Sequence, residues 1–349
     1  MTTINQESTL HRLLDGNRYF SLTGKGTTNH CPMALCALAG MGASSARLRA
    51  FFAYWEDNFA LPAPASISAI EPDQWPDAIA DPAAFHSLQQ CFTKWIDEAG
   101  CDAVVAEVLA RCPIAPASVA FHALIRLGHG LAVRHSGEIG AGLAAFVSSP
   151  LILPSVAAQH APAVSVSAGL GQLADSLNGI ATVGGSINAR LRSVVRRPDF
   201  VSACPAAPPG DALLDELADA AIRLVWQTDD FIALHMVTAV HAARELAGHL
   251  TAPLLQTLLP SIWVAYCAAY GAIGAPALRD VTRPEQEDMP HDWRPVLAAA
   301  IDSNDDHVIK LVHTCWLEQL RVPAALSAWL YYAVAVRACR SPWLSNATT

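Results

Sequence analysis

Lysine is nearly absent from this chain, which has 3 lysines and 19 arginines among its 349 residues. Charged residues of all kinds make up only 15% of the sequence, and the formal net charge is −9. Without clustered basic residues the chain lacks the positive face that phosphate backbones require, which argues against a nucleic-acid partner. The hydrophobic fraction of 52% also excludes disorder over most of the length and permits a large buried core.

Signals for secretion and for disulfide pairing are lacking as well. The opening residues, MTTINQESTLHRLLDG, are polar and contain no basic region followed by an apolar one. We therefore expect no signal peptide and a cytoplasmic protein. The nine cysteines include no CxxC pair, and Cys91, Cys101 and Cys112 have neither a zinc-ribbon nor a disulfide-scaffold spacing. We interpret the cysteines as free thiols in a reducing compartment.

Most local motifs that mark common enzyme classes are also missing. The sequence contains no GxSxG, no Walker A motif and no HExxH. It contains no Glu-x-x-His either, which excludes the usual di-iron helical bundle. The stretch GLGQLA at residues 169–174 matches GxGxxA, but no predicted strand precedes it and no acidic residue follows at the required distance. We therefore do not interpret it as a dinucleotide-binding loop.

What the sequence does contain is helical periodicity along nearly its whole length. A helical hairpin is predicted over about 29–59, followed by a surface connection over 62–84. Further helices are predicted over 84–98, 101–112, 118–134, 137–147, 211–226, 229–250, 253–270, 294–302, 305–320 and 323–337. No fixed-period repeat is visible, so a solenoid is not expected. The expected fold class is all-α, a single large helical domain over 1–349 with candidate ligands on several buried helices, and with 1–24 and 340–349 at the periphery.

Three stretches fit this pattern less clearly. Residues 254–278 are apolar and long enough to span a bilayer, but Pro260 and Gly271 interrupt them. We interpret them as a buried helix or helix pair and expect no membrane partner. Residues 150–185 are rich in proline, serine and glycine and remain ambiguous. Residues 276–293 are the most polar part of the chain and form either a mobile lid or a solvated loop.

Histidines are the remaining candidates for chemistry, and several of the 13 lie in apolar helical segments. These are His30, His122, His129, His235, His241 and His307. His122 and His129 are seven residues apart and share a helix face, and His241, Glu245 and His249 form another possible face. A lone buried histidine is usually a core residue bonded to a carbonyl, so a histidine-rich metal site and ordinary core histidines stay equally open. We interpret the following as structural: His11, His86, His135, His160 and His291.

Lys310 is unusual because it lies inside the apolar segment DDHVIKLVHTCWLEQL, residues 305–320. Burying a lysine requires a partner for its charge or a lowered pKa. His307 is three residues earlier and shares a helix face with Lys310, whereas His313 is rotated by about 120° from His307 on a straight helix. His307 is therefore the expected partner of Lys310.

Four blocks of the sequence together resemble the questin oxidase-like family. They are TNHCPMALCALAGMGA at 28–43, FHALIRLGHGLAV at 121–133, FIALHMVTAVHAAREL at 231–246 and DDHVIKLVHTCWLEQ at 305–319. The resemblance implies an all-helical oxidoreductase. Fungal members cleave rings of aromatic polyketides such as anthraquinones by a Baeyer–Villiger-type or dioxygenase-type reaction, so the implied partners are a small aromatic substrate and O2. Residues 150–210 match poorly, and part of the pocket lining is expected there.

The resemblance also implies a metal site, because the ring-cleaving relatives look like non-haem iron enzymes with four histidines and a carboxylated lysine. The matching positions in this sequence are His30, His122, His235, His307 and Lys310. His129 would either lie behind the ligands or be an alternative ligand. Asp305 or Asp306 would orient a ligand histidine. His241 and His249 fall outside the implied ligand set. Burial would favour the neutral amine of Lys310 that reacts with CO2 to give a carbamate. Histidine nitrogens with one carboxylate-like oxygen suit Fe(II) better than a closed zinc site.

Three functions remain to be separated. The first is a non-haem iron oxygenase that cleaves a polycyclic aromatic or quinone substrate. The second is a flavin- or NADPH-dependent oxidase, for which this chain offers no cofactor fingerprint but to which a separate reductase could supply electrons. The third is a non-catalytic helical protein that binds a small molecule, in which the five named positions would lie far apart. The sequence assigns no further catalytic residue and no oligomeric state.

Overall fold

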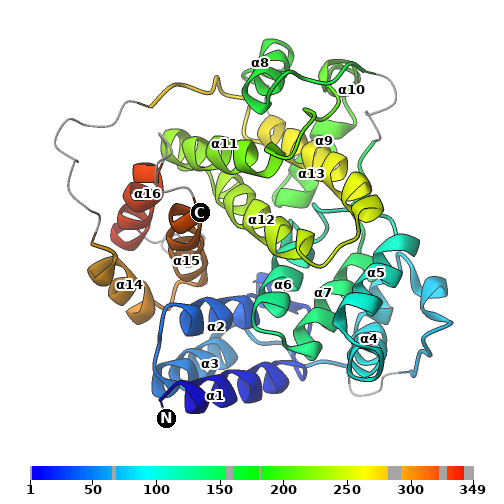
Figure 1. Cartoon of the computed structure of the whole chain (residues 1–349), viewed down its shortest axis with the longest axis vertical. Helices are drawn as coiled ribbons and strands as arrows, with labels where there is room; N and C mark the ends of the chain where they lie inside the picture. The colour runs from blue at the N-terminus through cyan, green and yellow to red at the C-terminus, as the bar shows by residue number, and fades with distance from the viewer. Residues whose placement is uncertain are drawn as a thin grey trace.

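The computed structural model describes residues 2–64, 68–154, 160–180, 182–281, 292–321 and 328–341. Within these residues the chain forms sixteen α-helices and one short hairpin, which confirms the all-α fold class (Figure 1). The helices are α1 Thr2–Asn17, α2 Cys31–Gly40, α3 Ser45–Phe59, α4 Phe85–Ala99, α5 Cys101–Arg111, α6 His122–Ala132, α7 Ser136–Ser148, α8 Val166–Leu177, α9 Ile187–Val195, α10 Pro198–Ala203, α11 Leu213–Thr228, α12 Phe231–Ala247, α13 Ala252–Ala272, α14 Trp293–Asp302, α15 Asp306–Arg321 and α16 Ala328–Arg340. The strands β1 Thr23–Gly24 and β2 Thr27–Thr28 pair antiparallel.

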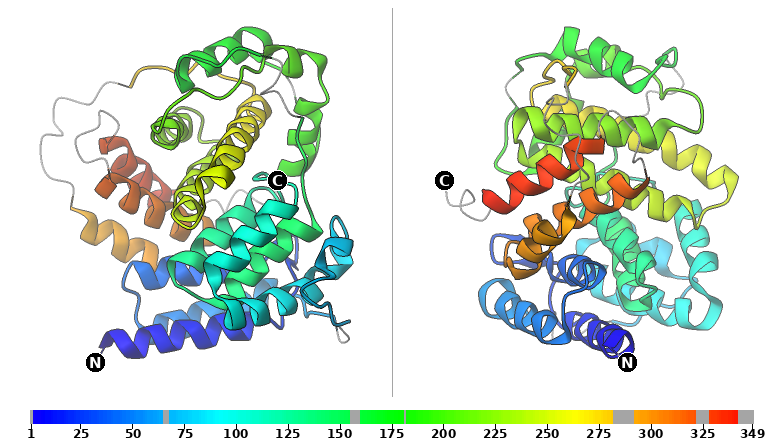
Figure 2. Two further views of the ribbon diagram at one scale, coloured as in Figure 1. Left: turned by 45° about the vertical axis from the view of Figure 1, so that its right-hand side comes forward. Right: turned by 60° about the vertical axis from the view of Figure 1, so that its left-hand side comes forward.

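The helices are arranged in groups around α12, which runs through the middle of the molecule (Figures 1 and 2). α1, α2 and α3 lie together at one end, and α4 to α7 form a bundle beside them. α8 to α11 and α13 lie at the opposite end, and α14, α15 and α16 pack along one side. This grouping leaves the inner ends of several helices close to one point.

Four helices from distant parts of the sequence meet at that point. α2 packs against α6 and α15, and α12 packs against the same two helices, so the four form a closed ring. Gly128 of α6 makes one of these contacts possible, because a Cβ atom there would lie 2.8 Å from the Cα atom of Ala242 in α12. Only glycine permits such a close approach of two backbones.

One difference from the predicted elements lies just before α6. The helix predicted over 118–134 begins only at His122, because the three residues before it are in the left-handed region. Their φ angles are 51° at Val119, 56° at Ala120 and 68° at Phe121. Residues other than glycine rarely adopt this conformation, and no local sequence signal predicts three such residues in succession.

The N-terminal segment also contains an element that the sequence analysis did not predict. Residues 1–24 were expected at the periphery, and α1 does lie at one edge of the molecule (Figure 1). Leu10 and Leu14 of α1 are nevertheless buried in the core, and α1 packs against α2 and α3. The segment therefore contributes apolar contacts behind α2.

The ambiguous stretches are largely helical where the structure describes them. GLGQLA at 169–174 lies inside α8, so it is not a loop that follows a strand. The apolar stretch forms α13, which by length and composition alone is the one described helix able to cross a membrane. Half of its most apolar window is buried, and it packs against α8, α9 and α12. Most of the loop at 276–293 lies outside the described residues. All nine cysteines are free, as predicted.

Candidate metal centre

The ring of helices brings four of the predicted histidines together. His30 precedes α2, His122 begins α6, His235 lies in α12 and His307 in α15. Their ring centroids are separated by 4.5 Å between His30 and His122, and by 4.7 Å between His30 and His307. The separation is 5.0 Å between His122 and His235, and 5.8 Å between His235 and His307. All four side chains are buried. This is a continuous histidine cluster and not the scattered arrangement that independent core histidines would give.

Two rings of the cluster are held by backbone carbonyls. His122 Nδ1 donates to the carbonyl oxygen of Val119 at 2.7 Å, a contact that the left-handed turn makes possible. That turn is held in place by the side chain of Asn188, whose Oδ1 accepts from the amide of Ala120 at 2.8 Å. His235 Nδ1 donates to the carbonyl of the residue one turn earlier, at 2.8 Å. The orientation of both rings is therefore set by the local backbone.

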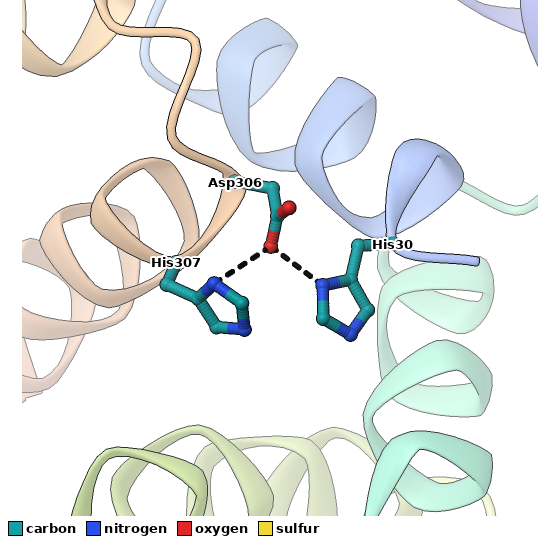
Figure 3. Close-up of side chains that lie close together, drawn as sticks. All are labelled: His30, Asp306 and His307. Carbon is teal, nitrogen blue, oxygen red and sulfur yellow. Dashed lines mark hydrogen bonds and ion pairs between the residues drawn. The ribbon is translucent and has the colours of Figure 1, made fainter. Parts of the chain in front are cut away.

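The other two rings are held by one buried carboxylate, that of Asp306 (Figure 3). Its Oδ1 accepts from Nδ1 of His30 at 2.6 Å and lies 3.2 Å from Nδ1 of His307. The same atom lies 3.2 Å from Nζ of Lys310. Asp305 accepts from the amide of His307 at 2.9 Å, which caps α15 and places Asp306 in its first turn, where the helix dipole favours a negative charge. Asp306 is thus the centre of a charged network.

The second ring nitrogen of each clustered histidine is left without a partner. Nε2 is buried in all four rings, and none of these atoms has a hydrogen-bond partner among the described residues. In His30, His122 and His235 the acceptor at Nδ1 is a carbonyl or carboxylate oxygen, so Nδ1 carries the hydrogen and Nε2 of the neutral ring carries the lone pair. Metal-binding histidines have this arrangement, in which an acceptor fixes one nitrogen and the other binds the ion.

The lowered pKa values of the clustered histidines also favour metal binding. Burial lowers the pKa of His30 to about 4, against the opposing effect of Asp306. Burial also holds the pKa values of His122 and His235 well below the ordinary value, and neighbouring histidines lower them further. These three rings are neutral at pH 7, so their Nε2 lone pairs are available to a cation.

The donor set therefore fits a divalent transition-metal ion. His30, Asp306 and His307 form a group whose candidate ligand atoms lie within 4.8 Å of one another, and the rings of His122 and His235 adjoin it. Nε2 of His30 and Nε2 of His307 both point away from Asp306, toward α12 (Figure 3). Imidazole nitrogens with a nearby anion suit iron, zinc, copper or nickel.

Lys310 lies against this cluster and is itself buried. Burial lowers its pKa, while the negative charges of Asp306 and Asp305 oppose that shift. The close Nζ contact with Asp306 is the geometry of an ammonium–carboxylate ion pair. Lys310 therefore pairs with Asp306, whose Oδ1 also contacts His30 and His307, and not directly with His307 as the sequence predicted.

The other candidate histidines, His129, His241 and His249, lie outside the cluster. His129 is two turns along α6 from His122, about 10 Å along the axis, and its ring stacks with His313 at 6.2 Å. His241 donates through Nδ1 to Glu318 at 2.7 Å. His249 instead contacts Asp102 at the surface, so the predicted face of 241, 245 and 249 does not form one site. Sequence reasoning missed the surface group Cys101, Asp102 and His249, whose candidate ligand atoms also lie within 4.8 Å of one another.

An open cleft of about 440 Å³ gives access to the histidine cluster. His30, His122 and His235 form part of its wall, beside the β1–β2 hairpin and residues 184–188. Residues 184–188 and Arg190, within the range 150–210 where part of the pocket lining was expected, thus line this cleft. Sequence reasoning did not identify two individual lining residues, Arg190 and Phe231, because neither belongs to a local motif.

Comparison with known proteins agrees with the four sequence blocks. A family profile described as questin oxidase-like matches residues 27–315, which is most of the chain and includes all five candidate ligand positions. A search of curated proteins finds no match.

Proposed function

The chain belongs to the questin oxidase-like family, and from this premise we propose that it is a metal-dependent oxygenase that cleaves a ring of a polycyclic aromatic or quinone substrate. Membership makes it an oxidoreductase with a small aromatic substrate and O2 as the implied partners. The observation that carries the metal dependence is the set of four buried, unpartnered Nε2 atoms beside an open cleft.

The candidate ligands are Nε2 of His30, His122, His235 and His307, with an oxygen donor from a modified Lys310. Fe(II) is the ion we propose, because imidazoles with one anionic oxygen and open positions are typical of non-haem iron oxygenases. When bound, the ion would supply the redox chemistry that the reaction of O2 with an aromatic ring requires. Burial keeps the imidazoles of His30, His122 and His235 neutral, and the acceptors at Nδ1 fix their tautomers.

Formation of a carbamate on Lys310 would depend on a bound metal cation. The carbamate forms when the neutral Nζ attacks the carbon of CO2, so that an N–C bond forms and one N–H proton is released. The product is an anion near the carboxylate of Asp306, where Lys310 now supplies a positive charge. Replacing a cation by an anion at a buried site is unfavourable unless another cation compensates. We therefore expect modification of Lys310 and metal binding to occur together.

The chain's own residues set the conditions for ring cleavage. A substrate bound in the cleft would lie against His30, His122 and His235, which form part of its wall. Two forms of the reaction differ in their electron balance. A dioxygenase-type cleavage places both oxygen atoms in the product and needs no external reductant. A Baeyer–Villiger-type insertion places one oxygen atom in the product, reduces the other to water, and needs two electrons from the substrate hydroquinone or from NADPH.

Metal analysis of untagged protein tests the proposal. We expect about one iron per chain after anaerobic reconstitution with Fe(II), because four imidazoles define one compact site. His122→Ala and His235→Ala should abolish tight iron binding while the chain remains folded. His313→Ala is the matched control, because it removes a buried histidine from α15 that lies outside the cluster. Equal metal content in all variants, or no retained metal in the unaltered protein, would refute the proposal.

A further inference from the structure

The cleft beside the histidine cluster has one charged side chain among the described residues of its wall, that of Arg190. Its other lining residues are glycines, small hydroxyl residues, apolar residues, Asn188 and the clustered histidines. No carboxylate is among the described residues of this wall. Arg190 is therefore the charged group that the described wall presents to a ligand.

Arg190 is held in position by neutral groups. Nε donates to Oγ1 of Thr182 at 2.9 Å, and Nη2 donates to the carbonyl of Ala272 at 2.5 Å. The nearest carboxylate is that of Asp230, 3.9 Å from Nη2, which is too long for a hydrogen bond. Nη1 has no hydrogen bond to a described residue. The guanidinium is thus fixed in direction while part of its donor capacity remains unused.

An exposed aromatic ring stands in the same cleft. Phe231 is 37% exposed, which makes it one of the exposed large hydrophobic residues of the protein. Its ring lies 4.7 Å from that of His235 and 4.6 Å from that of His307, measured between centroids. An exposed aromatic ring beside the candidate ligands offers a surface against which a planar ligand can pack.

We propose that the cleft selects planar aromatic compounds that carry an anionic oxygen, a carboxylate or an ionised phenol or enol. Arg190 pairs with the oxygen, because its planar donor array suits anionic oxygens, and the ring packs beside Phe231. This inference rests on the proposed function, since it names the substrate class for the same cleft. It goes further because it assigns specificity to two residues that are not candidate ligands.

Binding of two matched pairs of probes tests the assignment. The first pair is 2-naphthoate and its methyl ester, and the second is 2-hydroxy-1,4-naphthoquinone, which is ionised at neutral pH, and its methyl ether. In calorimetry at pH 7.5 the unaltered protein should bind each anion at least about tenfold more tightly than its neutral partner, the effect of one charge-assisted hydrogen bond. A preference within only one pair would identify the carboxylate or the enolate as the recognised group.

Variants separate recognition from folding. Arg190→Gln should remove the preference for the anion, and Arg190→Lys should retain part of it, because the charge stays while the planar array is lost. Arg192→Gln, an exposed arginine on the same helix, is the matched control and should keep the preference in full. Phe231→Ala should weaken both members of each pair by a similar factor.

Two outcomes would overturn the inference: equal binding within both pairs by the unaltered protein, or an unchanged preference in Arg190→Gln. Melting temperatures of the variants identify any that are unfolded, and Arg190→Lys then serves as the deciding variant. The titrations use metal-free protein, so that the probes bind without any contribution from a metal ion. Absence of the anion preference from a protein that does take up iron on reconstitution would refute this inference alone, whereas failure to take up iron would refute the proposed function alone.

Discussion

Replacing Asp306 by asparagine is expected to destabilise the metal-free protein more than any change to an exposed ion pair. Asp306 and Lys310 are both buried, and their charged atoms lie 3.2 Å apart. Asparagine keeps the size of the side chain and one acceptor for His30 or His307. It removes the negative charge and so leaves the ammonium group of Lys310 buried without its closest partner.

The size of the effect follows from the distance. At 3.2 Å and an effective dielectric constant of about 20, the attraction between the two charges is about 5 kcal/mol. Removing one partner of a buried pair costs about 3–5 kcal/mol. Burial already lowers the pKa of Lys310, so the lysine can escape part of this cost by losing its proton. We therefore expect Asp306→Asn to lower the free energy of unfolding by about 3 kcal/mol.

Urea denaturation of metal-free protein at pH 7.5 measures the change, and a double-mutant cycle with Lys310→Met isolates the pair. Asp306→Asn combined with Lys310→Met should be more stable than Asp306→Asn alone by about 1–2 kcal/mol, because no unpaired charge remains. Lys94→Met is the control, since Lys94 lies 4.0 Å from Glu98 in an exposed pair and should change stability by less than about 0.5 kcal/mol.

Additivity of the two single changes would refute this reasoning. It would mean that Lys310 and Asp306 do not interact as a charged pair in the metal-free protein. A change below about 1 kcal/mol for Asp306→Asn would lead to the same conclusion.

Three further predictions concern the surroundings of the cluster. The pKa of His313 is lowered to about 3, mainly by burial and to a lesser extent by the charge of His241. The unfolded chain therefore binds a proton at His313 at higher pH than the folded chain does. Stability should therefore fall as the pH drops from about 6.5 toward 3, and His313→Gln should reduce that slope by about 1.4 kcal/mol per pH unit in urea titrations. A Cβ atom at Gly40 would overlap His313 Nε2, so Gly40→Ala should lower the melting temperature even though alanine favours helices. Gly171 of α8 faces open space, so Gly171→Ala is the control and should raise the melting temperature. Arg126 and Glu138 form a buried pair with contacts of 2.6 and 3.0 Å, so Arg126→Met should cost about 3–5 kcal/mol in urea denaturation, and a loss below about 1 kcal/mol would contradict a charged pair.

Most helices, and the position of His307 and Lys310 on one face of α15, were accessible from the sequence because both depend on local spacing. The sequence predicted His307 as the partner of Lys310, whereas the charged partner of Lys310 in the structure is Asp306. Apolar residues at helical intervals predicted most elements within a few residues. A spacing of three places two side chains on one face whatever the rest of the chain does. The role of Asp306 was predicted only in part, as an aid to one histidine, whereas its oxygen contacts His30, His307 and Lys310.

The rest of the site depends on contacts that no local pattern specifies. His122 and His129 share a face, but their separation along the helix axis places them in different environments. Arg190 and Phe231 reach the cleft from different helices, and nothing in their sequence neighbourhood marks them as lining residues. The convergence of α2, α6, α12 and α15 is a property of the tertiary packing. Only the family resemblance pointed to it in advance.

The left-handed turn before α6 has a consequence for how this protein can be stabilised. Each of its three non-glycine residues adopts a conformation that costs about 1–2 kcal/mol relative to the right-handed one. Glycine would relieve that strain, but it would also free the carbonyl of Val119 that orients His122. A replacement that stabilises the turn would therefore degrade the histidine cluster, and laboratory stabilisation of this protein should leave residues 119–121 unchanged.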